Sequence, residues 1–335
     1  MIQKDYRLPA EWEPQSGVQL TWPHRNTDWA PMLDEVLAVY RQMAQEISRR
    51  ERLLVVAPEG CAPGMVHVVC PTDDTWARDH GFITLVPRDG QGEARLLDFC
   101  FNGWGGKFPA GLDNAINRRL FDVGAVSGQY VDHLDFVLEG GSIESDGRGT
   151  IFTTSSCLLA PCRNQPLSRE EIGRRLCDSL CADRVVWIDH GHLAGDDTDG
   201  HIDTLVRIAP DDTLLYMSCG DPSDEHFPEL RLMEEQLRSL RTLDGRPYRL
   251  LPLPLPRAVT DDSGERLPAT YANFLVVNGA VLCPTYGQPD FDREALATIA
   301  LAFPGRDIVG IDCRPLIRQH GSLHCCTMQF PEGVV

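Results

Sequence analysis

The sequence predicts an α/β fold, in the form of a single domain, residues 1–335, built as a fivefold pseudosymmetric α/β propeller. Three observations support this prediction. A helical stretch with one apolar stripe recurs five times, a short apolar or β-branched run follows each helix, and a second strand pair or its remnant lies behind each run. Such repetition is typical of folds assembled from one supersecondary unit.

The five predicted helices each place their apolar residues at helical spacing. The third is representative, because Ser168 and Glu171 form a capping box ahead of Ile172, Leu176 and Leu180. The five helices are expected near residues 31–49, 113–121, 168–180, 226–241 and 292–303.

Each helix leads into a short segment of strand-forming residues. Further strands follow, such as FITLVP (82–87) with ARLLDFCF (94–101), and HIDTLVRIAP (201–210), which turns at Asp211 and Asp212 into TLLYMS. The first strand after each helix is expected at 53–58, 129–134, 184–189, 248–253 and 307–312.

The two ends of the chain are predicted to meet. The last unit ends in SLHCCTMQF (322–330) without a closing strand, while GVQLTW (17–22) is a strand without a unit of its own. Pairing them would close a ring and remove exposed sheet edges. The alternative is an open α/β sheet divided into two domains near Gly220. The proline-rich segment 251–268 is expected to form a surface loop.

Composition and charge restrict the function. The chain is 42% hydrophobic and 24% charged, as in ordinary globular proteins, and its net charge of −18 should repel nucleic acid and attract cations. No segment approaches the roughly 20 apolar residues of a membrane span, and the opening residues lack a signal-peptide pattern. Twelve scattered cysteines without a C-x-x-C motif fit a reducing compartment. We therefore expect a cytoplasmic protein without a nucleic-acid or membrane partner.

Reactive or acidic side chains occur at comparable places in four of the five units. They are Cys325, His201 with Asp203, Asp79, and Glu139, whereas the fourth unit offers only Tyr271 and Asn273 at this place. In a closed ring these positions would converge on one pocket.

The residue types suit chemistry on a guanidinium group. A cysteine nucleophile needs a thiolate, and an ordinary thiol titrates near 8.5, so a bound cation or a protonated His201 would have to assist Cys325. In a strand, His201 and Asp203 would share a face, one carrying protons and the other holding a cation. Asp79 and Glu139 could pair with a planar guanidinium, although each alone could equally be a structural residue.

The chain resembles the agmatine deiminase family, a pentein-type group of guanidine-modifying enzymes related to bacterial peptidylarginine deiminases. The resemblance covers essentially the whole chain and is highly specific. It rests on LPAEWEPQSGVQLTWPH, TWARDHGF, NGWGGKF, LEGGSIESDGRGT, DDTDGHIDTLVR and GSLHCCTMQF, in that order.

The resemblance implies a role for each candidate residue. Cys325 is similar to the nucleophile, His201 to the general acid and base, Asp79 and Asp203 to the carboxylates that hold the guanidinium, and Glu139 to the acid that orients substrate and His201. It also implies the fivefold propeller, catalysis through a covalent thiouronium, no metal and no organic cofactor, and a homo-oligomer.

Three further residues are expected in the substrate site: Trp76, Trp104 and Asp197. Asp197 belongs to an acidic loop with Asp196 and Asp199 that could hold an ammonium group, or could simply be a solvated acidic loop.

Two positions depart from the family pattern. Ala77 replaces a methionine, and Cys326 stands where an aliphatic residue is expected. Neighbouring strand residues point to opposite sides, so only one of Cys325 and Cys326 would face the pocket; Cys325 is chosen because it follows His324, as in the family motif.

The predicted reaction is hydrolysis of agmatine, a small cationic substrate, to N-carbamoylputrescine and ammonia. Free arginine and C-terminal or peptidyl arginine carry the same reactive group and remain alternatives. So do an amidinotransferase and a catalytically silent polyamine-binding protein. Metal-dependent hydrolysis is less favoured, because the sequence has no H-E-x-x-H or paired-cysteine ligand set.

Overall fold

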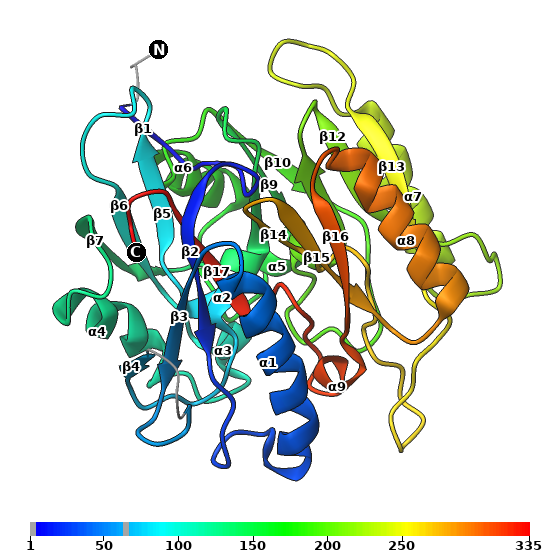
Figure 1. Cartoon of the computed structure of the whole chain (residues 1–335). Helices are drawn as coiled ribbons and strands as arrows, with labels where there is room; N and C mark the ends of the chain where they lie inside the picture. Colours follow the sequence, from blue (N-terminus) through cyan, green and yellow to red (C-terminus); the bar gives the residue numbers. More distant parts are fainter. Residues whose placement is uncertain (1–4, 63–66) are drawn as a thin grey trace.

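The computed structural model describes residues 5–62 and 67–335, and it is an α/β structure with five separate sheets (Figure 1). The strands, in their order across each sheet, are β1 (Tyr6–Arg7), β5 (Ile83–Pro87), β6 (Arg95–Cys100) and β7 (Gln129–Val137); β10 (Arg184–Ile188), β9 (Thr150–Thr154) and β8 (Ile143–Ser145); β11 (Val206–Ala209), β12 (Thr213–Ser218) and β13 (Arg249–Pro254); β14 (Leu275–Val277), β15 (Ala280–Thr285) and β16 (Asp307–Asp312); and β17 (Thr327–Pro331), β2 (Gln15–Thr21), β3 (Arg52–Ala57) and β4 (His67–Val69).

The five sheets share one pairing pattern. In each, two strands pair antiparallel and the second of them pairs parallel with a third, as β11, β12 and β13 do. A parallel neighbour requires a crossover connection, and in each of these five three-strand units a helix supplies it. The crossover helices are α1 (Leu33–Ser48), α4 (Ile116–Asp122), α6 (Arg169–Ser179), α7 (Phe227–Ser239) and α8 (Pro289–Ala302). The five predicted repeats are therefore present.

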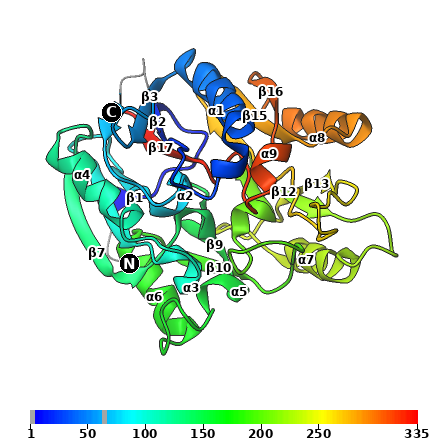
Figure 2. The same cartoon turned by 90° about the horizontal axis from the view of Figure 1, so that it is seen from below.

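The crossover helices bury the apolar stripes that predicted them. In α6 the capping box forms as expected: the Ser168 hydroxyl accepts a hydrogen bond from the Glu171 amide at 3.3 Å, and the Glu171 carboxylate accepts one from the Ser168 amide at 2.8 Å. Ile172 and Leu176 are fully buried on the inner face. Seen from below, α4, α1, α8, α7 and α6 lie around the periphery with the sheets inside them (Figure 2).

The short helices occupy the connections between strands. Among the described residues, three are single α-helical turns: α2 (Ala77–His80), α5 (Ser155–Leu158) and α9 (Arg314–Ile317). The short segment α3 (Gly103–Gly106) departs from helical geometry, because φ is positive at Trp104 and Gly105. Four are 3₁₀ turns: η1 (Ala30–Met32), η2 (Asp113–Ala115), η3 (Gly140–Ser142) and η4 (Ile202–Thr204). Within the described residues, no helix is long and apolar enough to cross a membrane.

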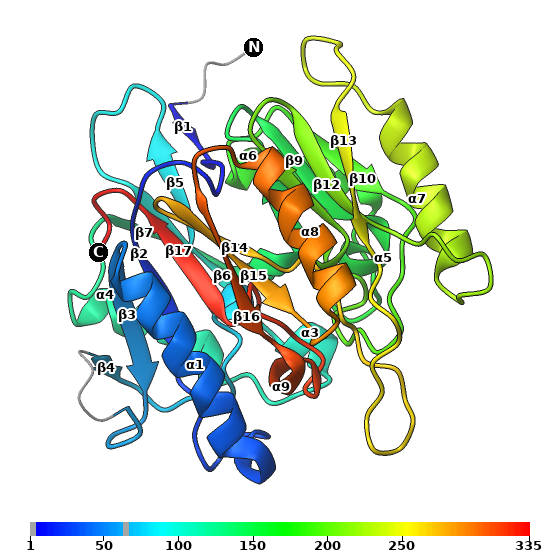
Figure 3. The same cartoon turned by 45° about the vertical axis from the view of Figure 1, so that its right-hand side comes forward.

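The predicted pairing of the chain ends is confirmed. β2 and β17 pair antiparallel, with Leu20 opposite Thr327 and Gly17 opposite Phe330. The two strands lie side by side in Figures 1 and 3. No sheet of the described segments closes on itself, and the alternative of a single open sheet divided near Gly220 is not what these segments form.

Three expectations about local structure need correction. His201 and Asp203 do not lie in a strand, because η4 precedes β11 and β11 begins only at Val206. Cys325 also precedes its strand, since β17 begins at Thr327. The expected surface loop 251–268 contributes residues 251–254 to β13, where they pair with β12.

Candidate active site

A pocket open to solvent gathers five of the predicted site residues. Cys325, Asp79, Trp76, Trp104 and Asp197 all line it. The other residues of its wall are Asp28, Asp74, Phe108, Thr198, Gln319, His320 and Gly321. Three further predicted residues, Glu139, His201 and Asp203, are fully buried rather than part of this wall.

Each sheet contributes to this centre from the turn just before the first strand of its antiparallel pair. Asp79 precedes β5, Gly141 precedes β8, Asp203 precedes β11, Asn273 precedes β14 and Cys325 precedes β17. The sequence predicted comparable site positions in four units. In the structure, Asn273 occupies the same place in the remaining unit, the one that contains β14.

Cys325 lies in a turn held by Asn273. The Asn273 side-chain oxygen accepts hydrogen bonds from the His324 amide at 2.9 Å and the Cys325 amide at 3.3 Å, and it lies 3.4 Å from Cys325 Sγ. Burial raises the pKa of the Cys325 thiol well above its usual range, and the charges of Asp203 and Asp79 raise it further. In the free protein at neutral pH, this cysteine is therefore a thiol.

Asp79 sits on α2 with both carboxylate oxygens engaged. Oδ2 accepts a hydrogen bond from Trp104 Nε1 at 2.9 Å, and Oδ1 accepts one from the Gly141 amide at 3.2 Å. Burial and the nearby carboxylates of Asp203 and Glu139 raise the pKa of Asp79 to about 6, although His201 lowers it. Asp79 is still an anion at neutral pH.

His201, Asp79 and Asp203 converge around Gly141. A Cβ atom built on Gly141 would lie 2.6 Å from His201 Nδ1, 2.9 Å from Asp79 Oδ1 and 3.1 Å from Asp203 Oδ2. His201 and Asp203 lie close together, as expected, but the cause is the η4 turn and not strand alternation. Glycine at 141 leaves the space in which the three groups approach.

His201 is arranged to be a cation. Its Nδ1 lies 3.6 Å from Asp79 Oδ1, and Cys157 also interacts with the ring. Burial lowers the pKa of His201, but the Asp79 carboxylate, with smaller effects that include Glu139, outweighs it and raises the pKa to about 10. At neutral pH the ring can donate a proton.

Asp203 keeps one oxygen free. Its Oδ2 lies 2.7 Å from His324 Nδ1, whereas Oδ1 is buried without a hydrogen-bond partner. Burial raises the pKa of Asp203, but the hydrogen bond and charge of His324, together with His201, outweigh it and hold the pKa below the ordinary value. An unpartnered buried carboxylate oxygen is costly, so it marks a position for a hydrogen-bond donor.

Glu139 is fully buried behind His201. Arg163 Nε donates to both of its oxygens, at 2.9 and 3.2 Å. Ligand atoms of Glu139, Cys157 and His201 all lie within 4.8 Å of one another. Glu139 is therefore placed to orient His201. It is not placed to touch a substrate from the pocket wall.

The two predicted tryptophans form part of the pocket wall. Trp76 and Trp104 meet edge to face with ring centroids 6.4 Å apart. Trp76 Nε1 donates to Asp74 Oδ2 at 2.9 Å, so each indole is tied to a carboxylate, Asp74 for one and Asp79 for the other.

The acidic loop divides into structural and pocket residues. Asp196 accepts hydrogen bonds from the Thr198 and Gly200 amides. Asp199 pairs with Lys107 at 2.8 Å and Arg163 at 2.6 Å. Asp197 alone of the three faces the pocket, so the structural alternative is correct for its two neighbours.

Sequence reasoning missed several residues of the wall. Asp74 could have been suggested by the acidic pair that precedes Trp76, but Asp28, Gln319 and His320 belong to no recognised pattern. Cys326, which follows Cys325 in the sequence, is fully buried and does not line the pocket. Its side chain is hydrogen-bonded with Tyr40.

Two groups have the composition of metal ligands: Glu139, Cys157 and His201, and Glu11, Glu144 and His324. In both groups, which lie among the described residues, the carboxylates already pair with guanidinium groups: Glu139 with Arg163 in the first, and Glu11 and Glu144 with Arg207 and Arg78 in the second. Because those charges are already balanced, the residues present do not fit a divalent cation.

The fold and the pocket together define an α/β protein with a cysteine, a histidine and two carboxylates around one centre. Comparison with known proteins then gives the family. The sequence profile of the Porphyromonas-type peptidyl-arginine deiminase family matches residues 7–331, and the chain belongs to this family.

Among its relatives, the agmatine deiminase of Pseudomonas putida is 34% identical over 98% of this chain and 96% of its own length. A Porphyromonas gingivalis structure described as "Putative Arginine Deiminase" is 51% identical, with a TM-score of 0.92 over 98% of this chain and 99% of that one. A cysteine-to-serine agmatine deiminase of C. jejuni, solved with substrate bound, is 36% identical, with a TM-score of 0.90 over 98% and 97%.

Proposed function

We propose that this protein hydrolyses agmatine to N-carbamoylputrescine and ammonia. The observation that carries the proposal is the convergence of Asp79, Asp203 and His201 around Gly141, in a centre whose solvent-facing wall carries Cys325. Two carboxylates and a thiol around one space suit a planar cation whose carbon is to be attacked.

The guanidinium would be held by Asp79 and by the free Oδ1 of Asp203. Their charges oppose ionisation of Cys325 in the empty site. A bound guanidinium would neutralise them, so the thiol would lose its proton to solvent once the substrate is present. The thiolate would then face a carbon fixed at attack distance.

His201 would act first as an acid and then as a base. The thiolate forms the S–C bond, and His201 gives its proton to the departing nitrogen, so that the C–N bond breaks and ammonia leaves a thiouronium. The now neutral His201 takes a proton from water, whose oxygen attacks the same carbon and expels the thiolate. Glu139, held by Arg163, would keep the ring oriented.

The pocket mouth favours an amine over an amino acid. Beyond Asp79, its wall carries the carboxylates of Asp28, Asp74 and Asp197, and no arginine or lysine among the described residues lines it. The primary ammonium of agmatine suits such a wall, whereas the α-carboxylate of free arginine would be repelled.

We also infer that the five sheets are blades of one propeller, and that the chain forms one domain. The common pairing pattern, the β2–β17 pairing of the chain ends, the peripheral crossover helices (Figure 2) and the equivalent origins of the site residues support this arrangement.

The test is ammonia release from agmatine, free arginine and an arginyl peptide in reducing, metal-free buffer. We expect activity on agmatine to exceed that on the other two by at least about 10²-fold in kcat/KM, the size of effect that an unpaired buried charge produces. A preference for free arginine or for the peptide would refute the substrate assignment. Turnover that requires an amine acceptor would indicate a transferase.

A further inference from the structure

Asp203 is the innermost member of a row of close polar contacts that leads from the substrate site through His324 to Glu11. His324 Nδ1 lies 2.7 Å from Asp203 Oδ2, and His324 Nε2 lies 2.7 Å from Glu11 Oε1. The His324 and Asp203 side chains are at most 1% exposed, and that of Glu11 is 21% exposed. The segment before β2 thus reaches a carboxylate of the active site through one imidazole.

The direction of the first hydrogen bond is fixed. Asp203 is ionised at neutral pH, because its pKa lies below the ordinary value, so the proton between it and His324 must belong to Nδ1. Burial, Arg207 and Arg78 lower the pKa of His324, so at neutral pH the ring carries only this proton and Nε2 is an acceptor. Nε2 then accepts from Arg207 Nη2, which also donates to Glu11, so Glu11 holds the ring through this guanidinium. The hydrogen bond from Nδ1 occupies Oδ2 and sets the rotation of the carboxylate. Oδ1, which has no partner, is the oxygen left for a substrate.

The other side of the ring is held by charges. Arg207 Nη2 lies 2.6 Å from Glu11 Oε2 and 3.2 Å from His324 Nε2, and Arg78 Nη1 lies 3.2 Å from Glu11 Oε1. Arg207 is itself fixed by Glu144 and by the carbonyls of Ala272 and Phe274. The charged groups that face His324 are therefore Glu11, Asp203, Arg207 and Arg78.

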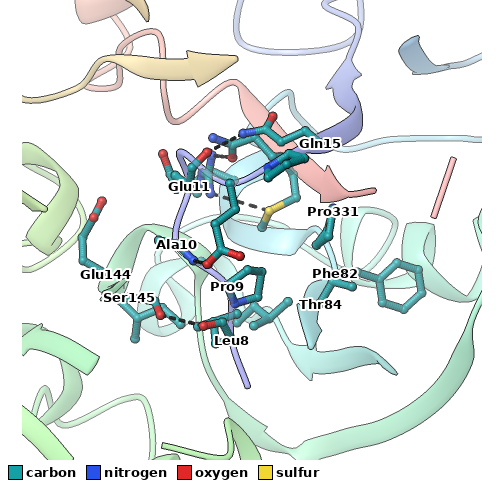
Figure 4. A pocket seen from close by; sticks show the side chains of 18 residues that line it. Leu8, Pro9, Ala10, Glu11, Gln15, Phe82, Thr84, Glu144, Ser145 and Pro331 are labelled. Atoms are coloured by element: carbon teal, nitrogen blue, oxygen red, sulfur yellow. Dashed lines mark hydrogen bonds and ion pairs between the residues drawn. The ribbon is translucent and has the colours of Figure 1, made fainter. Parts of the chain in front are cut away.

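Glu11 also lines a second pocket that shares no residue with the substrate pocket. Figure 4 shows Glu11 and Gln15 in the upper part of this pocket, with Pro9 and Leu8 of the same segment below them. This second pocket is open to solvent and has a cavity volume of about 90 Å³, so a small solute can reach the carboxylate of Glu11 without passing the substrate.

We propose that Glu11 and His324 are positioning residues, and that the chain from Glu11 through His324 to Asp203 holds Oδ1 of Asp203 toward the substrate guanidinium. This inference rests on the proposed function for the role of Asp203. It gives the N-terminal segment, which is distant from the nucleophile in sequence, a role in positioning the catalytic groups.

The first experiment is chemical rescue of Glu11→Ala with formate. Loss of a hydrogen bond to a charged group should lower kcat/KM for agmatine by about 10- to 100-fold. Formate supplies a carboxylate of the right size to the second pocket, so it should restore kcat/KM in a saturable manner, and the bulkier benzoate should not.

Glu13→Ala is the matched control. Glu13 lies on the same segment and lines the same pocket, but its partners are Arg7 and the Ala10 amide. Formate should have no effect on the wild type or on this variant. Equal responses of Glu11→Ala and Glu13→Ala to formate would overturn the proposal, because they would reveal a general effect on the segment.

Removal of Glu11 takes one carboxylate away from each of two buried guanidinium groups, Arg207 and Arg78, and could prevent folding. Glu11→Gln keeps the shape and a hydrogen bond but removes the charge. It should fold, with kcat/KM between those of wild type and Glu11→Ala. Wild-type kcat/KM in this variant would contradict a role for the carboxylate.

A substrate-free measurement separates this inference from the proposed function. In ¹⁵N-histidine NMR, His324 should give an Nδ1–H resonance protected from water exchange, assigned by its absence in His324→Gln. It should weaken in Glu11→Ala and recover with formate. A wild-type His324 without a protected Nδ1 proton would refute the chain even in an enzyme active on agmatine. If the protein is inactive on agmatine but the Nδ1 proton is protected, the contacts from Glu11 through His324 to Asp203 are supported, and only the proposed substrate is refuted.

Discussion

Individual side chains in the pocket take their properties from burial and from one another. Cys325 has a raised pKa because it is buried between two carboxylates, and His201 has a raised pKa because one of those carboxylates is its neighbour. The same charges that disfavour the thiolate in the empty site are the charges that would bind a cation. The chemistry is therefore expected to depend on the substrate being present.

Replacement of Cys325 by serine should abolish ammonia release and preserve binding. Serine lacks a nucleophile of comparable strength, so kcat should fall by about 10⁴-fold or more, while calorimetry should still detect agmatine binding. Cys326→Ser is the matched control and should retain kcat, because Cys326 does not line the pocket. Activity lost with Cys326 and kept with Cys325→Ser would reverse the assignment.

The pH profile of kcat/KM should have an acid limb and an alkaline limb. The free enzyme holds Cys325 as a thiol that loses its proton to solvent when substrate binds, so kcat/KM should rise with pH between the two limbs and form no plateau. Asp79 must be ionised to hold the cation, so activity should fall as the pH decreases below about 6. His201 must be protonated to release ammonia, so activity should fall as the pH rises above about 10. Stopped or continuous ammonia assays across this range test both limbs.

Asp74→Asn is the control for the acid limb, because burial also raises the pKa of Asp74 to about 6. The limb should persist in this variant whatever its maximal rate. Disappearance of the limb would assign it to Asp74 and not to Asp79.

At the scale of elements, the crossover helices and their strands follow directly from local pattern. The apolar stripe of α6 and its capping box could both be predicted from the sequence, because helical periodicity and capping depend only on residues that are close in sequence. The turns that carry the site could not. Apolar alternation from Ile202 to Val206 suggested a strand, but a strand needs a partner, and β12 pairs only from Val206 onward.

Gly141→Ala should impair activity while leaving the fold intact. The added Cβ would press on His201 Nδ1 and on both carboxylates, which must shift. A displacement of this size should lower kcat/KM by about 100-fold. Gly111→Ala is the control, since a Cβ there meets no atom within 4 Å and φ is not positive. Unchanged kinetics in Gly141→Ala, with melting temperatures matched, would contradict the geometry of the centre.

At the scale of the whole molecule, the net charge of −18 should draw a dication toward the pocket. We expect kcat/KM for agmatine to fall several-fold between about 20 mM and 300 mM salt, because the Debye length shortens from roughly 20 Å to roughly 6 Å over this range and exposed charges are increasingly screened. The decrease should lie in KM, with kcat at saturation nearly constant. Kinetics independent of salt would show that the global field does not steer the substrate.

The sequence by itself determined the alternation of helices and strands, the five repeats, the meeting of the chain ends and the identities of the cysteine, histidine and acids of the site. These follow from periodicity and from residue chemistry. Tertiary structure alone decided that Asp197 faces the pocket while Asp196 and Asp199 stabilise their loop, that Asp74 and His320 join the wall, and that Glu11 contacts His324. The reason is that burial and pairing set the charge state of each group, and both depend on segments that lie up to 313 residues apart in sequence.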